Sequence, residues 1–159
     1  MAASATAAGV LAAALGPVPR LPVLLVAAVL GVLLAVIDMR CLRLPDPLVG
    51  ALALSAGVPL ALLEPGRITT ALVAAGYLGI AMLPGRGLGL GDVKLGAVLA
   101  FLLGFGGFPA VIVGLGAAHL INGVVAGWLL ISGRARRGRG LPFGPALLAG
   151  ALIGLVTAA

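Results

Sequence analysis

The sequence predicts an all-α protein, a polytopic bundle of transmembrane helices. Hydrophobic residues make up 62% of the 159-residue chain and charged residues only 9%, whereas a soluble domain carries about 25% charged residues. The 26 glycines point the same way, because small residues let helix backbones approach closely in lipid, where packing drives association. These observations exclude an ordinary soluble fold.

Six apolar runs are interpreted as core helices of one membrane-embedded domain that covers residues 1–159. The runs are residues 21–37, 47–63, 68–83, 91–108, 109–132 and 141–158. Several are near or below the roughly 20 residues that cross a bilayer, so we expect local thinning or helices that extend beyond the apolar run. Residues 1–15 are apolar and lack the basic n-region of a secretory signal. They are interpreted as a short extra helix, with residues 1–20 as helix and linker and 21–159 as the core.

The positions of Lys and Arg predict the orientation of the helices, because cytoplasmic loops carry an excess of positive charge. If the first core helix runs inward, only Arg20 and Arg67 are external. The remaining basic residues are then cytoplasmic: Arg40, Arg43, Arg86, Lys94, Arg134, Arg136, Arg137 and Arg139. We therefore expect a multi-pass protein of the cytoplasmic membrane. The net charge of +6 reflects these loops and not a nucleic-acid partner, since no long basic face is present.

Two aspartates lie at the ends of predicted helices on the same side. Asp38 ends the first inward-going run, and Asp92 begins the fourth run, which goes outward. An ionisable side chain in a membrane segment costs roughly 2.5 to 3.5 kcal/mol on insertion scales and is a functional candidate by default. Aspartic peptidases need two carboxylates that share one proton, one to activate water and one to protonate the scissile carbonyl. The pair therefore predicts a peptidase active site on the cytoplasmic side.

Each acidic residue also has a structural interpretation. Asp92 follows Gly89, Leu90 and Gly91 and fits a helix N-cap. Asp38 could form an ion pair with Arg40 or Arg43. For Asp46, which lies between two prolines, an N-cap role is favoured.

Three short motifs in order carry a family resemblance. Gly89-Leu90-Gly91-Asp92-Val93-Lys94 resembles the GxGD signature of type IV prepilin peptidases, and Ile37-Asp38 followed by Leu44-Pro45-Asp46 resembles their first-aspartate segment. Leu141-Pro142-Phe143-Gly144-Pro145 resembles their third motif. The three motifs span about 110 residues of the chain, which makes the match more specific than a lone GxGD.

The resemblance implies that Asp38 and Asp92 are catalytic and that the substrates are pilin-like precursors with a short basic leader. The large zinc-binding insertion of the longer family members, associated with methylation of the product, has no counterpart here. The chain therefore resembles the compact peptidases of tight-adherence (Flp-type) pili or archaeal preflagellins. The sequence has one cysteine, Cys41, and no CxxC pair, so no metal or other cofactor is predicted.

Several other residues have both a substrate-contact and a structural interpretation. Gly89 and Gly91 leave room beside the carboxylate for a substrate backbone. Lys94 is more typical of an interfacial anchor than of a substrate contact, and Cys41 of a small packed residue. The His119 and Asn122 side chains share a helix face and favour interhelical hydrogen bonds over proton transfer. Phe143, Gly144 and Pro145 fit substrate access and the start of the last helix equally well.

Two other functions stay open. Presenilin-type and signal-peptide-peptidase-type intramembrane proteases also use GxGD, and Pro145-Ala146-Leu147 reproduces their Pro-Ala-Leu triplet. Against them stand the small size and the Ile37-Asp38 context. A small proton-coupled transporter or an assembly scaffold would need no peptide cleavage, and no internal repeat supports a transporter.

Overall fold

The computed structural model describes residues 2–82, 89–134 and 141–158, and in these ranges the chain is helical with no strand. The helical segments in chain order are α1 (Ala2–Leu15), α2 (Leu21–Cys41), α3 (Asp46–Leu52), the π-helical turn η1 (Ala53–Gly57), α4 (Val58–Leu63), the 3-10 turn η2 (Pro65–Arg67), α5 (Ile68–Met82), α6 (Leu90–Gly104), α7 (Phe108–Ile131) and α8 (Gly144–Thr157). The all-α prediction is confirmed, and the extra helix predicted for residues 1–15 is α1.

Three helical stretches are long and apolar enough to cross a membrane by length and composition. They are Leu21–Cys41, Asp46–Leu63, in which α3, η1 and α4 follow one another directly, and Phe108–Ile131. These stretches indicate a membrane protein. The predicted runs at 68–83, 91–108 and 141–158 correspond to the shorter helices α5 and α6, of 15 residues each, and α8, of 14 residues. A 15-residue helix rises about 22 Å, less than a bilayer core of about 30 Å.

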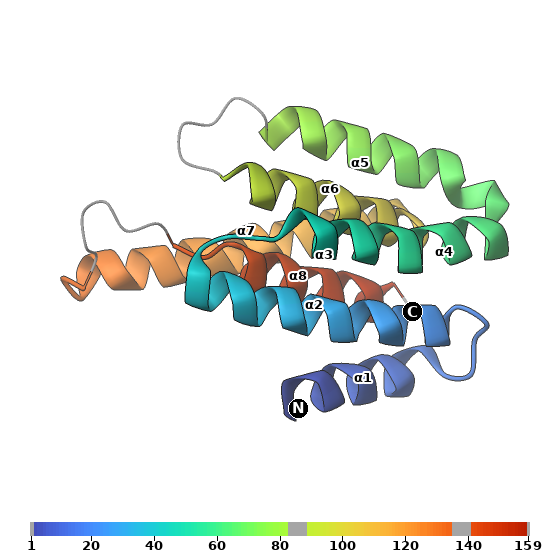
Figure 1. Cartoon of the computed structure of the whole chain (residues 1–159), viewed down its shortest axis with the longest axis horizontal. Helices are drawn as coiled ribbons and strands as arrows, with labels where there is room; N and C mark the ends of the chain where they lie inside the picture. The colour runs from blue at the N-terminus through green and yellow to red at the C-terminus, as the bar shows by residue number, and fades with distance from the viewer. Residues whose placement is uncertain (1, 83–88, 135–140, 159) are drawn as a thin grey trace.

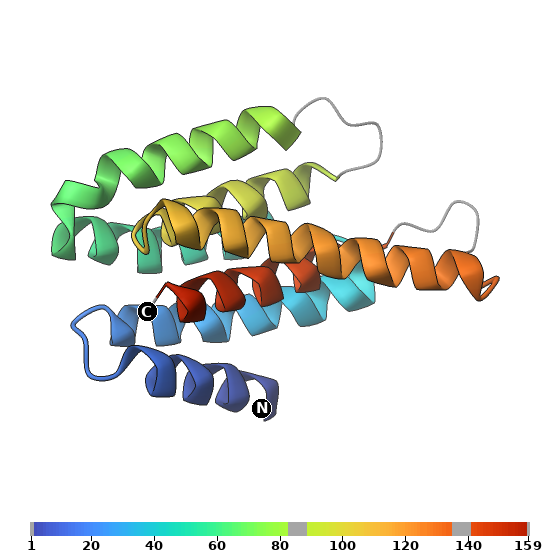
Figure 2. The ribbon, with the colours of Figure 1, turned by 180° about the vertical axis from the view of Figure 1, so that it is seen from behind.

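The helices alternate in direction, so the helix ends gather at two opposite ends of the bundle (Figure 1). The last turns of α2, α5 and α7 and the first turns of α6 and α8 lie at one end (Figures 1 and 2). We call it the aspartate end because Asp38 is in the last turns of α2 and Asp92 in the first turn of α6. The connections that follow α1, α4 and α6 lie at the other, which we call the Glu64 end.

The basic residues divide between the two ends as the alternation predicts. Arg20 and Arg67 are at the Glu64 end, where both pair with Glu64. The other basic residues that the structure describes belong to the aspartate end: Arg40, Arg43, Lys94 and Arg134. Arg86, Arg136, Arg137 and Arg139 of the prediction lie outside the described residues.

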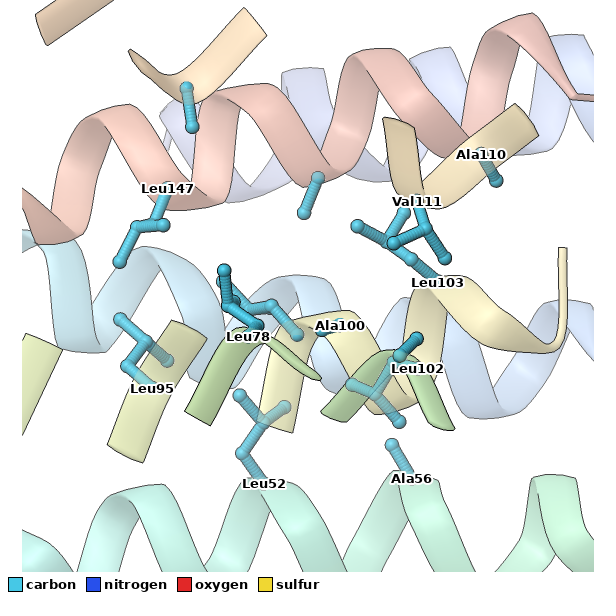
Figure 3. Packing of buried hydrophobic residues seen from close by; sticks show 14 of the residues in the cluster. Leu52, Ala56, Leu78, Leu95, Ala100, Leu102, Leu103, Ala110, Val111 and Leu147 are labelled. Atoms are coloured by element: carbon cyan, nitrogen blue, oxygen red, sulfur yellow. The ribbon is translucent and has the colours of Figure 1, made fainter. Parts of the chain in front are cut away.

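Helix α6, which carries Asp92 in its first turn, lies at the centre of the hydrophobic core. Its buried side chains Leu95 and Leu102 face Leu52 of α3 and Ala56 of η1, while Leu103 faces the α7 side (Figure 3). The α6 helix also packs along α5 and against α8. Neighbouring helices therefore hold α6 on several sides.

Close approach of backbones at small residues holds the neighbouring helices together. A Cβ atom at Gly150 or Gly154 of α8 would overlap backbone atoms of α7, including those of Gly114. A Cβ atom at Gly104 of α6 would overlap the backbone of Ala71 in α5. The prediction that the glycines of this chain serve close helix packing is confirmed at these positions.

Candidate active site

Asp38 and Asp92 line one cavity of about 510 Å³ at the aspartate end. Asp38 comes from the last turns of α2 and Asp92 from the first turn of α6. The other lining residues come from these helices, from the connection between α2 and α3, and from the first residue of α3: Leu42, Arg43, Leu44, Asp46, Gly89, Leu90, Gly91 and Lys94. The fold thus brings together two carboxylates that are 54 residues apart in sequence.

Asp38 lies within α2, its side chain is buried, and it accepts a hydrogen bond from a distant part of the chain. The helix continues to Cys41, four residues beyond the predicted apolar run, so Asp38 lies within the helix and not at its end. Its side chain is only 4% exposed. The backbone N–H of Gly144 donates a hydrogen bond to Asp38 Oδ2 at 2.9 Å. The alternative ion pair with Arg40 or Arg43 is not formed in the structure.

Gly144 supplies this hydrogen bond because it is the first residue of α8. The first N–H groups of a helix have no partner within the helix and are free to bind an acceptor. A Cβ atom at position 144 would lie 2.8 Å from Asp38 Oδ2 and 3.2 Å from its Cγ, which is closer than real Cβ contacts come. Phe143 is the N-cap and Pro145 lies in the first turn. The motif therefore starts the last helix, and its glycine also contacts Asp38.

Asp92 is the third residue of α6 and lines the same cavity as Asp38. The N-cap is Gly89, which has extended backbone angles, so the N-cap interpretation of Asp92 is wrong. The Asp92 carboxylate interacts with the backbone of Gly89 and electrostatically with Asp38. A carboxylate in the first turn of a helix is stabilised by the helix dipole. Asp92 is half-buried, and it is accessible from the cavity that it shares with Asp38.

A second close contact sets the position of the α6 start. A Cβ atom at Gly91 would lie 3.1 Å from Leu44 Cβ and 3.6 Å from Leu44 N. Leu44 follows Leu42, which ends α2 with a left-handed backbone (φ 50°) and donates its N–H to the carbonyl oxygen of Asp38 at 2.8 Å. This turn directs the chain from the end of α2 toward α6, and glycine at position 91 allows the contact.

Asp46 and Lys94 form an ion pair at the rim of the cavity. Lys94 Nζ donates to Asp46 Oδ2 at 2.7 Å, and the two side chains are 53% and 65% exposed, respectively. The sequence interpretation of Asp46 as an N-cap is wrong, because Pro45 is the N-cap of α3 and Asp46 is its first residue. The carboxylate binds a cation instead of backbone N–H groups. Lys94 is likewise bound to a side chain and does not extend alone toward head groups.

His119, Asn122 and Cys41 do not line the cavity. His119 Nδ1 is 2.8 Å from the carbonyl oxygen of Leu115 in the same helix, so the predicted interhelical hydrogen bond is not formed by this nitrogen. The His119 ring instead packs edge-on against Phe143, with ring centroids 5.4 Å apart. Cys41 is exposed, and its predicted role as a packed residue is wrong.

The chemistry available at the cavity is that of two neighbouring carboxylates. Neither Asp38 nor Asp92 forms an ion pair with any residue that the structure describes. No group of three or more His, Cys, Asp or Glu in the described ranges is placed to bind a metal ion. Two carboxylates that line one cavity and interact electrostatically without a cation can hold one proton between them. Such a pair can both accept a proton from water and donate one to a substrate.

Two contacts of the site were not identified from the sequence. The Gly144 N–H that binds Asp38 is 106 residues away from it, and the motif around it predicted only a helix start or substrate access. The contact of Gly91 with Leu44 was also missed. A glycine inside a short motif at a helix start indicates close approach of another group, but it does not identify the partner.

No protein family, curated protein or solved structure was found to match this chain.

Proposed function

We propose that this chain is a membrane aspartic endopeptidase of the prepilin peptidase type, with Asp38 and Asp92 as its catalytic pair. The observation that carries the proposal is the shared cavity, which is lined by two carboxylates from distant segments of an apolar helix bundle. Neither carboxylate is paired with a described cation. Placing two such groups together in a membrane protein is costly and is typical of chemistry that moves protons.

The reaction follows from a carboxylate pair that shares one proton. The ionised carboxylate takes a proton from water, and the water oxygen attacks the carbonyl carbon of the scissile amide. The protonated carboxyl group donates its proton to the carbonyl oxygen. When the tetrahedral intermediate collapses, the C–N bond breaks and the leaving nitrogen takes up the proton removed from water. The hydrogen bond from Gly144 keeps the Asp38 carboxylate oriented toward the cavity.

The proposed substrates are pilin-like precursors, and the product is a mature subunit without its basic leader. The choice of substrate depends on the three sequence motifs, whereas the carboxylate pair in the cavity supports only the chemistry of the reaction. The proposed topology has six core helices across the cytoplasmic membrane, with α1 as an extra helix and the aspartate end on the cytoplasmic side. Four described basic residues at that end, against two at the Glu64 end, favour this orientation.

The depth of the carboxylates favours a second candidate, an intramembrane protease of the presenilin type. Only three residues join α6 to α7, so the end of α6 and the start of α7 lie at the same level at the Glu64 end. Asp92 is 12 residues from the end of α6, or about 18 Å along the helix. Trp128 is 20 residues from the start of α7, or about 30 Å, the thickness of the bilayer core. Asp92 therefore lies about 12 Å below the level of Trp128, and water must reach it through the cavity.

The proposal is tested by co-expression with a pilin-like precursor and by scoring leader removal with Asp38→Asn and Asp92→Asn separately. Each amide keeps the size of the side chain but can neither accept nor donate the shared proton, so we expect each variant to abolish cleavage. Asp46→Asn is the matched control because Asp46 lines the same cavity and is 65% exposed. It should retain most of the activity.

The same variants separate the candidate functions. A leaderless transmembrane peptide offered in parallel distinguishes the two proteases, since only the intramembrane type should cut it. Full cleavage by either Asp38→Asn or Asp92→Asn would reject both. Loss with Asp46→Asn alone would assign the first catalytic acid to position 46 instead of 38.

A further inference from the structure

A second cavity lies among α1, α2, α6 and α8, away from the carboxylate pair. Its volume is about 230 Å³. All of its lining residues have apolar side chains or are glycine, and the walls include Leu11 of α1, Ala28 of α2, Leu102 of α6 and Leu148 of α8. Neither Asp38 nor Asp92 lines it.

The cavity exists because small residues face one another across the helices. The α1 wall presents Ala7 beside Leu11, and the α2 wall presents Ala28 and Gly31. Leu11 is nearly fully buried at 2% exposure, yet the alanines around it do not fill the remaining space. An unfilled space of this kind destabilises a protein in proportion to its volume, because the lining atoms have no partners on one side.

The size and chemistry of the cavity limit its occupant. Water needs two to four polar partners in a buried site, and the side chains that line this cavity supply none. A cavity of about 150 Å³ holds benzene. A segment of a flexible hydrocarbon chain therefore fits both the volume and the lining.

We propose that this cavity binds a segment of one acyl chain of a bilayer lipid. The surroundings of an apolar bundle in a membrane consist of such chains, so the occupant is present at high concentration. Helix α1, which precedes the core, forms one wall of the cavity and packs on α2 and α8, and the cavity stays open on one side, through which a lipid chain can enter. The inference does not depend on peptidase activity.

The test uses the full chain reconstituted in phosphatidylcholine vesicles that contain a photoreactive diazirine on one acyl chain. Adduct positions after illumination are mapped by mass spectrometry. We expect adducts at Leu11 and Leu148 to exceed those at Leu33, an outward residue of α2 that is 45% exposed. The variant Ala28→Phe fills the cavity and should reduce the Leu11 and Leu148 adducts severalfold. Val26→Phe, on the outward face of α2 (Val26 is 48% exposed), should leave them unchanged.

A second variant keeps the test decisive if Ala28→Phe does not fold. Ala7→Phe fills the cavity from α1, which lies at the edge of the bundle (Figure 1), and should reduce the Leu148 adducts in the same way. Uniform labelling of all outward positions, with no excess at Leu11 or Leu148, would overturn the inference. Labelling at these two residues that persists in the filled variants would overturn it as well.

Discussion

The carboxylate of Glu64 at one end of the bundle is paired with cations, whereas those of Asp38 and Asp92 at the other end are not, among the residues that the structure describes. At the Glu64 end, the carboxylate of Glu64 is 3.5 Å from Arg20 Nη1 and 3.2 Å from Arg67 Nε. Arg67 Nη1 also donates to the carbonyl oxygen of Phe105 at 2.7 Å. One carboxylate thus links the three connections at that end through two cations.

At the aspartate end, Asp38 and Asp92 are held by backbone groups and glycine contacts, and of the described carboxylates there only Asp46 at the rim is paired with a cation. Asp38 is bound by the N–H of Gly144, and Asp92 interacts with the backbone of Gly89. A carboxylate that is neutralised by cations joins segments of the chain, whereas Asp38 and Asp92, left without cations, stay free to exchange protons.

The largest effect is expected from Gly144→Ala. The added Cβ would lie 2.8 Å from Asp38 Oδ2, so the carboxylate must rotate or α8 must shift. A displacement of about 1 Å of a catalytic group costs about 100-fold in rate, and we expect a loss of that size in leader cleavage. Gly116→Ala is the matched control, since a Cβ there meets nothing within 4 Å. Equal activity of the two variants would show that the hydrogen bond does not position Asp38.

A smaller loss is expected from Gly91→Ala. Its Cβ would lie 3.1 Å from Leu44 Cβ, so the start of α6, with Asp92, must move by a few tenths of an ångström. Overpacking of this kind costs about 1 to 3 kcal/mol, and we expect about a tenfold loss of cleavage, near the low end of that range. Gly50→Ala, where a Cβ meets nothing within 4 Å, is the control. A Gly91→Ala variant as active as this control would exclude a positioning role for the contact.

These glycines mark the limit of prediction from the sequence. The helices and the shared end of Asp38 and Asp92 could be predicted, because apolar runs and their alternation depend only on local composition and chain direction. The bond from Gly144 to Asp38 could not, because it depends on the rotation and spacing of two helices packed through small residues. Asp46 was misjudged for a related reason: its neighbouring prolines indicate an N-cap, but the Lys94 side chain from α6 is close enough to bind the carboxylate.

At the Glu64 end, Glu64→Gln should affect stability and not chemistry. The amide cannot neutralise Arg20 and Arg67, and the side chain of Glu64 is 25% exposed. The expected loss is about 1 kcal/mol after solvent screening, or about 2–4 °C in the midpoint of thermal unfolding in detergent. Leader cleavage below that temperature should stay within about twofold of the unchanged chain. A large loss of cleavage with an unchanged midpoint would contradict the division between the two ends.

The smallest effect is expected at the rim of the cavity. There Lys94 neutralises Asp46, as Arg20 and Arg67 neutralise Glu64 at the other end. Their side chains are 53% and 65% exposed, and exposed pairs contribute only about 0.2–1 kcal/mol. A double-mutant cycle with Lys94→Gln, Asp46→Asn and both together should therefore give a coupling of about 0.3 kcal/mol in cleavage rate, less than a twofold effect. A coupling well above 1 kcal/mol would mean that this pair positions the α6 start, as Gly91 does. The aspartate end would then also depend on a cation.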